Sequence, residues 1–230
     1  MRKLGTGLLA CVVLAGTALA SPVGWIHPEA GRFGVGGEVG AITNRDLEWN
    51  SGNNVAEIDQ SVYYVGRIGY GLTDQVEIYG RLGGADLDLR STVGGLGWTG
   101  TAGGSTEFAW GVGLQGVIYD AGTWNLAGDA NYFAHNSHTL NSIGVNDADF
   151  WEWQVGLQAQ TQFDQFYPYL GVKYSDANIQ YTNLSPDLEA DDNVGVYVGA
   201  GFNLSGNWSG YLEGRFVDET SFGGGVQYRF

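Results

Sequence analysis

Polar and apolar residues alternate with a period of two along most of the chain, in segments of roughly ten residues separated by turn residues. Such alternation indicates strands that present one apolar face, and its repetition at this length is typical of β-barrels that cross a membrane. Ten segments show it, at approximately 31–43, 60–72, 75–87, 105–119, 122–135, 149–163, 166–181, 192–204, 207–217 and 221–230. The pattern predicts an all-β fold, a transmembrane antiparallel up-and-down β-barrel with ten strands.

The connections between these segments alternate between short and long. Tight turns, which we expect on the periplasmic side, are predicted at 71–75, 119–122, 163–165 and 204–207. Longer polar connections, which we expect on the extracellular side, are predicted at 44–59, 88–104, 136–148 and 182–191. The last outer connection, 218–221, is short. Ten strands require it to be a hairpin, and if it is only a bulge the even number expected of such barrels would be eight.

A soluble β-sandwich would show the same alternation, so the placement of aromatic residues decides between the two architectures. On the apolar face, aromatic residues fall near the strand ends and aliphatic residues between them, which favours two membrane-interface girdles around a lipid-facing band. The predicted interface aromatics are Phe108, Trp110, Trp124, Trp151, Trp153, Tyr174, Trp208, Phe216, Phe222 and Tyr228.

The first residues have the features of an export signal. Arg2 and Lys3 precede an apolar run at 4–16, and Ala18-Leu19-Ala20 is an A-x-A cleavage site. We therefore expect residues 1–20 to be a cleaved signal peptide and residues 21–230 to form a single barrel domain in a Gram-negative-type outer membrane, reached through the periplasm. Cys11 keeps a lipoprotein signal open as an alternative.

Composition supports a closed sheet and limits the partners. The chain contains 39 Gly, 13 Tyr, 10 Phe and 8 Trp, with only 15% charged residues, which suits strands that curve and close. Its formal net charge of −15 argues against nucleic acid as a partner. We expect outer-membrane lipid and lipopolysaccharide around the barrel.

The last segment carries the features of a family resemblance. Phe222, Val226, Tyr228 and Phe230 fall on one face of a final strand, and 70–80 has the form of a strand-turn-strand repeat. The chain resembles the superfamily of small outer-membrane β-barrels that includes the OmpA transmembrane domain, OmpX and the opacity-type adhesins. The resemblance implies the fold, the location and recognition of the terminal strand by the barrel assembly machinery. Those relatives commonly have eight strands, so their loop functions do not transfer.

The polar face of the strands is assigned to the lumen, where acids and bases balance. Six bases and six acids fall there, namely Arg32, Glu38, Arg67, Glu77, Arg81, Glu107, Asp129, Glu152, Lys173, Glu213, Arg215 and Arg229. Unpaired charges in a narrow interior are costly, so equal numbers predict a paired network that plugs the barrel. Arg45 and Arg90 are left for the loops.

A narrow porin-like channel for small solutes stays open as an alternative. A barrel of ten strands lies near the size at which side chains just fill the interior. Glycines on inward positions would nevertheless leave space for a file of water, at Gly34, Gly36, Gly111, Gly113, Gly223 and Gly225.

A hydrolase whose active site lies on the barrel is the third functional hypothesis. His135, Ser137 and His138, with Asp147, Asp149 and Glu152 downstream, could supply a nucleophile, a base and an orienting carboxylate. The His-x-Ser pair is faintly similar to that of the outer-membrane lipid A deacylases, although it falls on the inward phase. Asp86 and Asp88 are similar to half of an omptin protease site, and no Asp-x-His-type partner appears in the chain.

The predicted outer loops are acidic, with Asp46, Glu48, Glu57 and Asp59 in the first and Asp187, Glu189, Asp191 and Asp192 in the fourth. Weak binding of divalent cations is chemically plausible there, although no fixed ligand spacing appears. We therefore predict a non-enzymatic barrel without a cofactor, serving envelope structure or surface interaction, with an extracellular partner that the sequence does not identify.

Overall fold

The protein is described by a computed structural model that covers residues 22–49, 55–93, 98–103, 105–140, 145–181 and 187–230. The predicted signal peptide at 1–20 lies outside the described residues. Within these ranges no helix is long and apolar enough to cross a bilayer.

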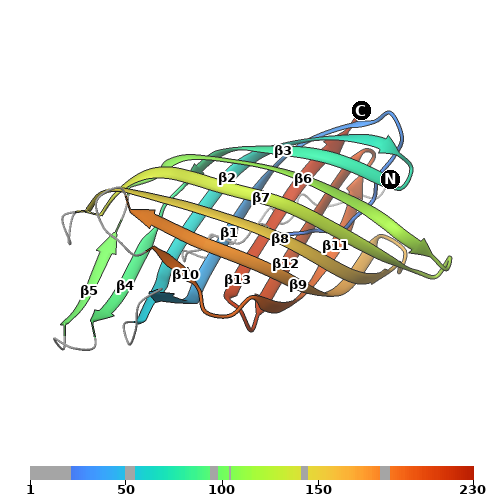
Figure 1. Ribbon diagram of the computed structural model, residues 1–230. Coiled ribbons are helices and arrows are strands. Elements are labelled where there is room, and N and C mark those ends of the chain that lie inside the picture. The colour runs from blue at the N-terminus through green and yellow to red at the C-terminus, as the bar shows by residue number, and fades with distance from the viewer. Residues whose placement is uncertain (1–21, 50–54, 94–97, 104, 141–144, 182–186) are drawn as a thin grey trace, which may run out of the picture.

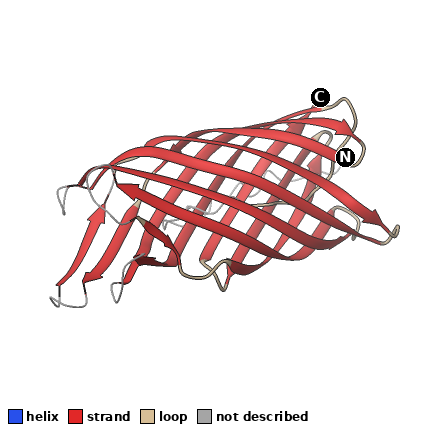
Figure 2. Ribbon diagram, viewed as in Figure 1, coloured by secondary structure: helices blue, strands red, loops and turns tan. Residues whose placement is uncertain are grey.

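Ten antiparallel strands close into a barrel, as predicted (Figure 1). The ring runs β1, β2, β3, β6, β7, β8, β9, β11, β12 and β13, and pairing of β13 with β1 closes it. These strands are β1 (Phe33–Trp49), β2 (Val55–Thr73), β3 (Val76–Ala85), β6 (Glu107–Asp120), β7 (Trp124–Leu140), β8 (Val145–Thr161), β9 (Phe166–Tyr181), β11 (Val194–Ser205), β12 (Trp208–Phe216) and β13 (Thr220–Arg229). The described part of the chain otherwise consists of three short strands, turns and loops (Figure 2).

The two ends of the barrel differ. Short connections join β2 to β3, β6 to β7, β8 to β9 and β11 to β12 at one end, which we call the turn end. Gly122 and Gly206 adopt positive φ in two of these turns, a conformation that glycine adopts without steric cost. The opposite end, which we call the loop end, carries the remaining strands, β4 (Asp88–Val93), β5 (Trp98–Gly103) and β10 (Leu188–Ala190) (Figure 1). The connection at 217–219 joins β12 to β13 in an antiparallel hairpin, which settles the strand count at ten.

Much of the chain expected in long outer loops forms strand instead. β1 and β2 extend for 17 and 19 residues, and β4 pairs with the loop-end part of β2. β10 pairs with both β9 and β1 beyond the short strands β11 to β13. These extensions alternate as well as the barrel does, since Leu47, Ile58 and Ile179 point inward and are buried. An apolar face that can be buried stabilises strand over loop.

A bulge in β1 changes which of its side chains face inward. Ile42 pairs with Ser221 and Asn44 with Thr220, so β1 has one extra residue relative to β13. Glu38, Gly40 and Ile42 are buried before this point, whereas Arg45 and Leu47 are buried after it. A β-bulge inverts the facing of all later side chains in this way. The prediction that Arg45 belongs to a loop was therefore wrong, because Arg45 is fully buried in the lumen.

The outer surface of the barrel is apolar between two belts of aromatic rings. Val112, Leu170 and Leu212 are each more than half exposed on this surface. Of the ten predicted interface aromatics, eight are exposed, and Trp151 and Tyr228 are partly buried. Neighbouring rings contact each other at both ends, as in Trp153 with Tyr174 near the loop end and Trp208 with Tyr228 near the turn end.

Candidate functional site: the filled lumen

The lumen contains three layers, and the first is an apolar core at the loop end. We call it the loop-end core. It is built by inward side chains of seven ring strands together with β4 and β10, principally Ile42, Leu47, Ile58, Leu87, Leu89, Phe133, Phe150, Ile179 and Leu188. Each of these side chains is at most 3% exposed. Side chains from opposite walls thus meet as in the core of a soluble domain.

The middle layer is a network of buried acids and bases, which we call the ionic network. On one side of the barrel, Arg67 lies 2.8 Å from Glu77 and 3.4 Å from Glu38. Arg81 lies 2.7 Å from Glu38, and Arg229 lies 3.2 Å from Glu77. Each carboxylate here therefore contacts two guanidinium groups.

A second cluster of the ionic network lies closer to the loop end. Lys173 contacts Glu219 at 2.6 Å and Asp218 at 2.7 Å. Arg45 contacts Glu152 at 2.9 Å and Glu219 at 3.4 Å. Arg215 lies 2.7 Å from Glu213, and it is 3.5 Å from Glu219.

Asp129 connects the two clusters through neutral donors. It accepts hydrogen bonds from the Tyr79 hydroxyl at 2.6 Å and from the Gln154 amide at 3.2 Å. The Tyr79 ring lies under the guanidinium of Arg67, 4.2 Å from its centroid, and Gln154 accepts a hydrogen bond from Arg215. The ionic network therefore spans the barrel wall to wall.

Ten of the twelve predicted lumen charges lie in this network, and two do not. Arg32 is partly exposed and lies 3.7 Å from Glu29 at the turn end. Glu107 is partly exposed and accepts a hydrogen bond from Ser105 at the loop end. Both lie at strand ends, where water solvates their charges, so that neither requires a buried partner.

Three charged residues of the network were missed by sequence reasoning. Arg45 was misplaced because the bulge in β1 is invisible in the alternation. Asp218 and Glu219 were predicted as an outer turn, yet both are at most 3% exposed. Val217, with a φ of 90°, turns the chain so that these carboxylates point back toward Lys173. The buried set among the described residues is thus six bases and seven acids, in place of the predicted six and six.

Tyrosine side chains fill the space that inward glycines were expected to leave. Tyr63 lies directly across from Gly40, Tyr79 from Gly113 and Tyr197 from Gly171. Two more such pairs join Tyr169 to Gly199 and Tyr211 to Gly225. In each pair a Cβ on the glycine would meet the tyrosine ring.

Aromatic cover of a cross-strand glycine is a known device for stabilising curved sheets. The six predicted inward glycines are likewise covered, by Gln227, Tyr132, Phe133, Tyr79, Pro22, Tyr211, Glu38 and neighbouring backbone. The expectation of open space at these positions was therefore wrong. A hydrophobic-polar pattern cannot show which side chain covers each glycine, because that depends on the register between paired strands.

The third layer is the segment 22–30, which precedes β1 and enters the lumen from the turn end. We call it the plug segment. Val23 and Ile26 are at most 5% exposed, and they pack with Ala127, Tyr169 and Tyr197. A cavity of about 30 Å³, space on the scale of one water molecule, lies between the plug segment and the ionic network.

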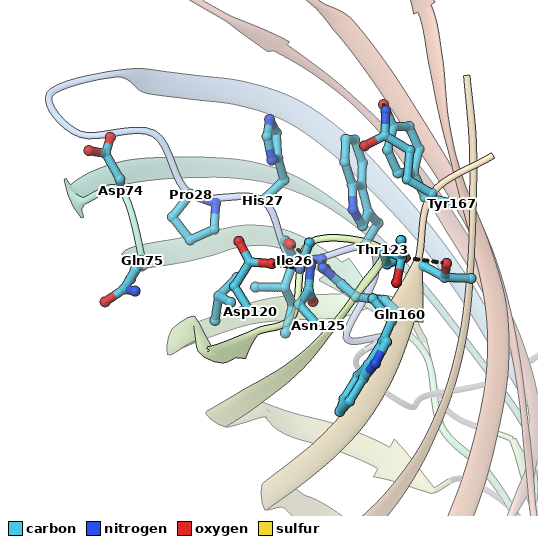
Figure 3. A pocket seen from close by; sticks show the side chains of 16 residues that line it. Ile26, His27, Pro28, Asp74, Gln75, Asp120, Thr123, Asn125, Gln160 and Tyr167 are labelled. Carbon is cyan, nitrogen blue, oxygen red and sulfur yellow. Dashed lines mark hydrogen bonds between the residues drawn. The ribbon is translucent and has the colours of Figure 1, made fainter. Parts of the chain in front are cut away.

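Buried side chains of the barrel wall satisfy the backbone of the plug segment. Glu213 accepts hydrogen bonds from the amides of Val23 and Gly24, and Arg81 donates to the carbonyl of Pro22 at 2.9 Å. Gln160 bonds both the amide and the carbonyl of Ile26, in the region seen in Figure 3. Buried backbone groups require such partners, so the wall is complementary to this peptide.

The residues considered for hydrolysis lie in or beside the loop-end core. His138 Nδ1 donates to the carbonyl of Ser105 at 3.0 Å, so His138 Nε2 is the acceptor for His135 Nδ1. His135 is fully buried and stacks on Phe150. The side chains of Ser137 and Asp147 lie outside the described residues. Asp86 accepts a hydrogen bond from the amide of Val62. Among the described residues, no three or more of His, Cys, Asp and Glu are grouped to hold a metal ion.

A scan against protein-family models finds no match, and a search of the curated proteins finds none. The solved structures similar to this chain include an outer-membrane channel from Pseudomonas putida F1, with 12% identity, a TM-score of 0.48, and 92% of this chain and 100% of that chain covered. OprG from Pseudomonas aeruginosa has 16% identity, a TM-score of 0.46, and 89% and 98% coverage. The outer-membrane protease OmpT from Escherichia coli has 11% identity, a TM-score of 0.42, and 90% and 99% coverage.

Proposed function

We propose that this chain is an integral outer-membrane β-barrel whose closed lumen makes it a structural and surface-display protein. The turn end faces the periplasm and the loop end faces outward. The exposed aliphatic band between two aromatic belts supports membrane insertion, because lipid contact favours a closed sheet with an apolar outer face. The final strand, with Phe222, Val226, Tyr228 and Phe230, would be recognised by the barrel assembly machinery.

The filling of the lumen is the observation that carries the proposal against conduction. A permeating solute would have to displace the plug segment, separate buried ion pairs and cross the loop-end core. Removing one partner of a buried ion pair typically costs about 3–5 kcal/mol, and the ionic network is only one of the three layers that oppose an open path.

The outward face at the loop end supports a role in display. Asp46 lies across from Glu57, and Glu48 lies across from Glu189, so acidic side chains are neighbours on this wall. Arg90 contacts Glu57 and Asp59, each at 2.7 Å. This acidic surface would attract cationic partners and repel anionic ones. Weak binding of divalent cations there belongs to the same proposal.

Planar bilayer recording on the refolded protein tests the closed lumen. We expect no unitary current under conditions in which a general porin, used as the positive control, conducts. Insertion would be verified separately by protease protection in vesicles of the same lipid. Reproducible current steps from inserted protein would contradict the proposal and favour the narrow channel.

A further inference from the structure

A polar cavity of about 410 Å³ lies at the turn end, beside the plug segment. Trp25, Ile26, His27 and Pro28 of the plug segment form one wall, and the turns β2–β3, β6–β7 and β8–β9 form the others (Figure 3). The volume falls within the range of about 300–1,000 Å³ found for small-molecule sites. The cavity exists because the plug segment is seated.

One side of this cavity is a stack of three rings. Trp25 lies between His27 and Tyr167, with ring centroids 4.6 Å and 3.8 Å apart and interplanar angles of 6° and 17°. His27 is the outermost ring, and 48% of its side chain is exposed. The stack holds the wall flat and fixes its position relative to β9.

The rest of the lining offers hydrogen-bonding groups with unused capacity. The Oδ1 atom of Asn125 is buried and has no hydrogen-bond partner among the described residues. Asp120 accepts one hydrogen bond, from the Gly122 amide, and Asp74 accepts one, from the Ala30 amide. A carboxylate has about four acceptor positions, so both retain free lone pairs.

The charges of the residues that line the cavity favour some classes of ligand over others. It contains Asp74 and Asp120, and no Lys or Arg among its described residues. An anionic ligand would be repelled, and a wholly apolar one would leave these polar groups without partners. We infer that the cavity binds a neutral saccharide, whose hydroxyls donate to carboxylate and amide oxygens while an apolar sugar face packs on the ring wall.

Titration calorimetry on the refolded full-length chain in detergent micelles tests the inference. The neutral probe is N,N′-diacetylchitobiose, and the anionic probe of similar chemistry is glucose 6-phosphate. We expect saturable heat with the first and none with the second. Calcium chloride, titrated separately, distinguishes a cation site formed by the two carboxylates. Saturable calcium binding with no saccharide binding would overturn the inference.

Substitutions of lining residues test whether the measured heat comes from saccharide binding in this cavity. Asn125→Leu keeps the side-chain volume and removes the unpartnered oxygen, so we expect binding about tenfold weaker, as for the loss of one good hydrogen bond. Gln75→Ala is a second substitution in the cavity lining. Because Gln75 lies in an exposed turn, this variant should fold even if Asn125→Leu does not. Asn136→Ala, exposed at the loop end, is the matched control. Unchanged affinity in both lining variants, or no heat up to about 10 mM saccharide, would overturn the inference.

Discussion

Arg45 shows how a single buried side chain organises the ionic network. Its guanidinium joins Glu152 of β8 to Glu219, which belongs to the connection between β12 and β13, and it also donates to the hydroxyl of Ser175 in β9. The side chain is fully buried, so water cannot replace any of these partners. A charge in such surroundings is tolerated because of its partners, and its removal leaves the partners uncompensated.

Arg45→Met should therefore destabilise the barrel by about 3–5 kcal/mol, since it leaves Glu152 and Glu219 each short of a cation. Urea unfolding of the barrel refolded in lipid vesicles measures this as a change in the free energy of unfolding. Arg90→Met is the matched control, because Arg90 forms its ion pairs at a partly exposed site, where a loss of about 1 kcal/mol or less is expected. Equal losses in the two variants would contradict the assigned role of Arg45.

His27 should make seating of the plug segment dependent on pH. Partial burial, and then the charge of Arg229, hold the pKa of His27 below its usual value of about 6.5. When the plug segment is displaced, His27 therefore binds a proton more readily than when it is seated. Seating is unaffected at pH 8, where both states are neutral, and it weakens as the pH falls below about 6.5.

Hydrogen exchange of the amides of Val23, Gly24 and Ile26, corrected for the intrinsic rate, measures this at pH 8 and pH 5.5. Protection should fall at the lower pH. His27→Gln should remove the part of the change that belongs to this imidazole. Protection that is independent of pH in the unmodified chain would show that His27 does not control seating.

At the scale of elements, the plug segment and the loop-end core close opposite ends of the lumen independently. The plug segment is bound by Glu213, Gln158, Gln160 and Arg81 of the wall. The loop-end core has no contribution from this segment, since its members come from β1 to β10. Each closure therefore has its own set of contacts.

Deletion of residues 22–29 should open a blind cavity at the turn end without creating a conducting pore. We expect planar bilayer recording to show no unitary current. The side-chain amides of Gln158 and Gln160 in β8 should exchange their hydrogens faster, because they lose their hydrogen-bond partners in the plug segment. The full-length chain is the reference for both measurements. Unitary currents in the deletion variant would mean that the plug segment is the sole barrier.

The whole molecule has an inside-out distribution of polarity in its central section. Charged side chains cluster in the lumen, and Leu170, Val172 and Leu212 are exposed on the outside. The loop end reverts to the arrangement of a soluble protein, with apolar side chains inside and acids outside. On the proposed membrane location, we expect this change along the barrel axis to coincide with the edge of the bilayer.

Leu212→Arg tests that boundary. Leu212 is 63% exposed at the middle of β12, where an arginine should cost about 2–4 kcal/mol of folding free energy in a bilayer. Asn136→Arg is the control, at an exposed side chain in the loop-end part of β7, and it should cost about 1 kcal/mol or less. The measurement is urea unfolding in vesicles. Equal free-energy costs at both sites would contradict the assignment of Leu212 to the part of the barrel within the bilayer.

The alternation of residues determined the all-β fold, the approximate positions of the ring strands and the inward facing of ten of the charged residues in the ionic network. These are local properties, because the side-chain period of a strand requires no knowledge of its neighbours. The same pattern failed for Arg45, since one extra residue in β1 inverts the facing of everything beyond it.

Only the tertiary structure decided how the lumen is filled. The pairing of Tyr63 with Gly40 and of Tyr197 with Gly171 depends on register, which joins residues far apart in the chain. The seating of the plug segment depends on the lumen, which exists only after the barrel has closed. Strand periodicity therefore specified the wall of this protein, and contacts between distant strands specified its interior.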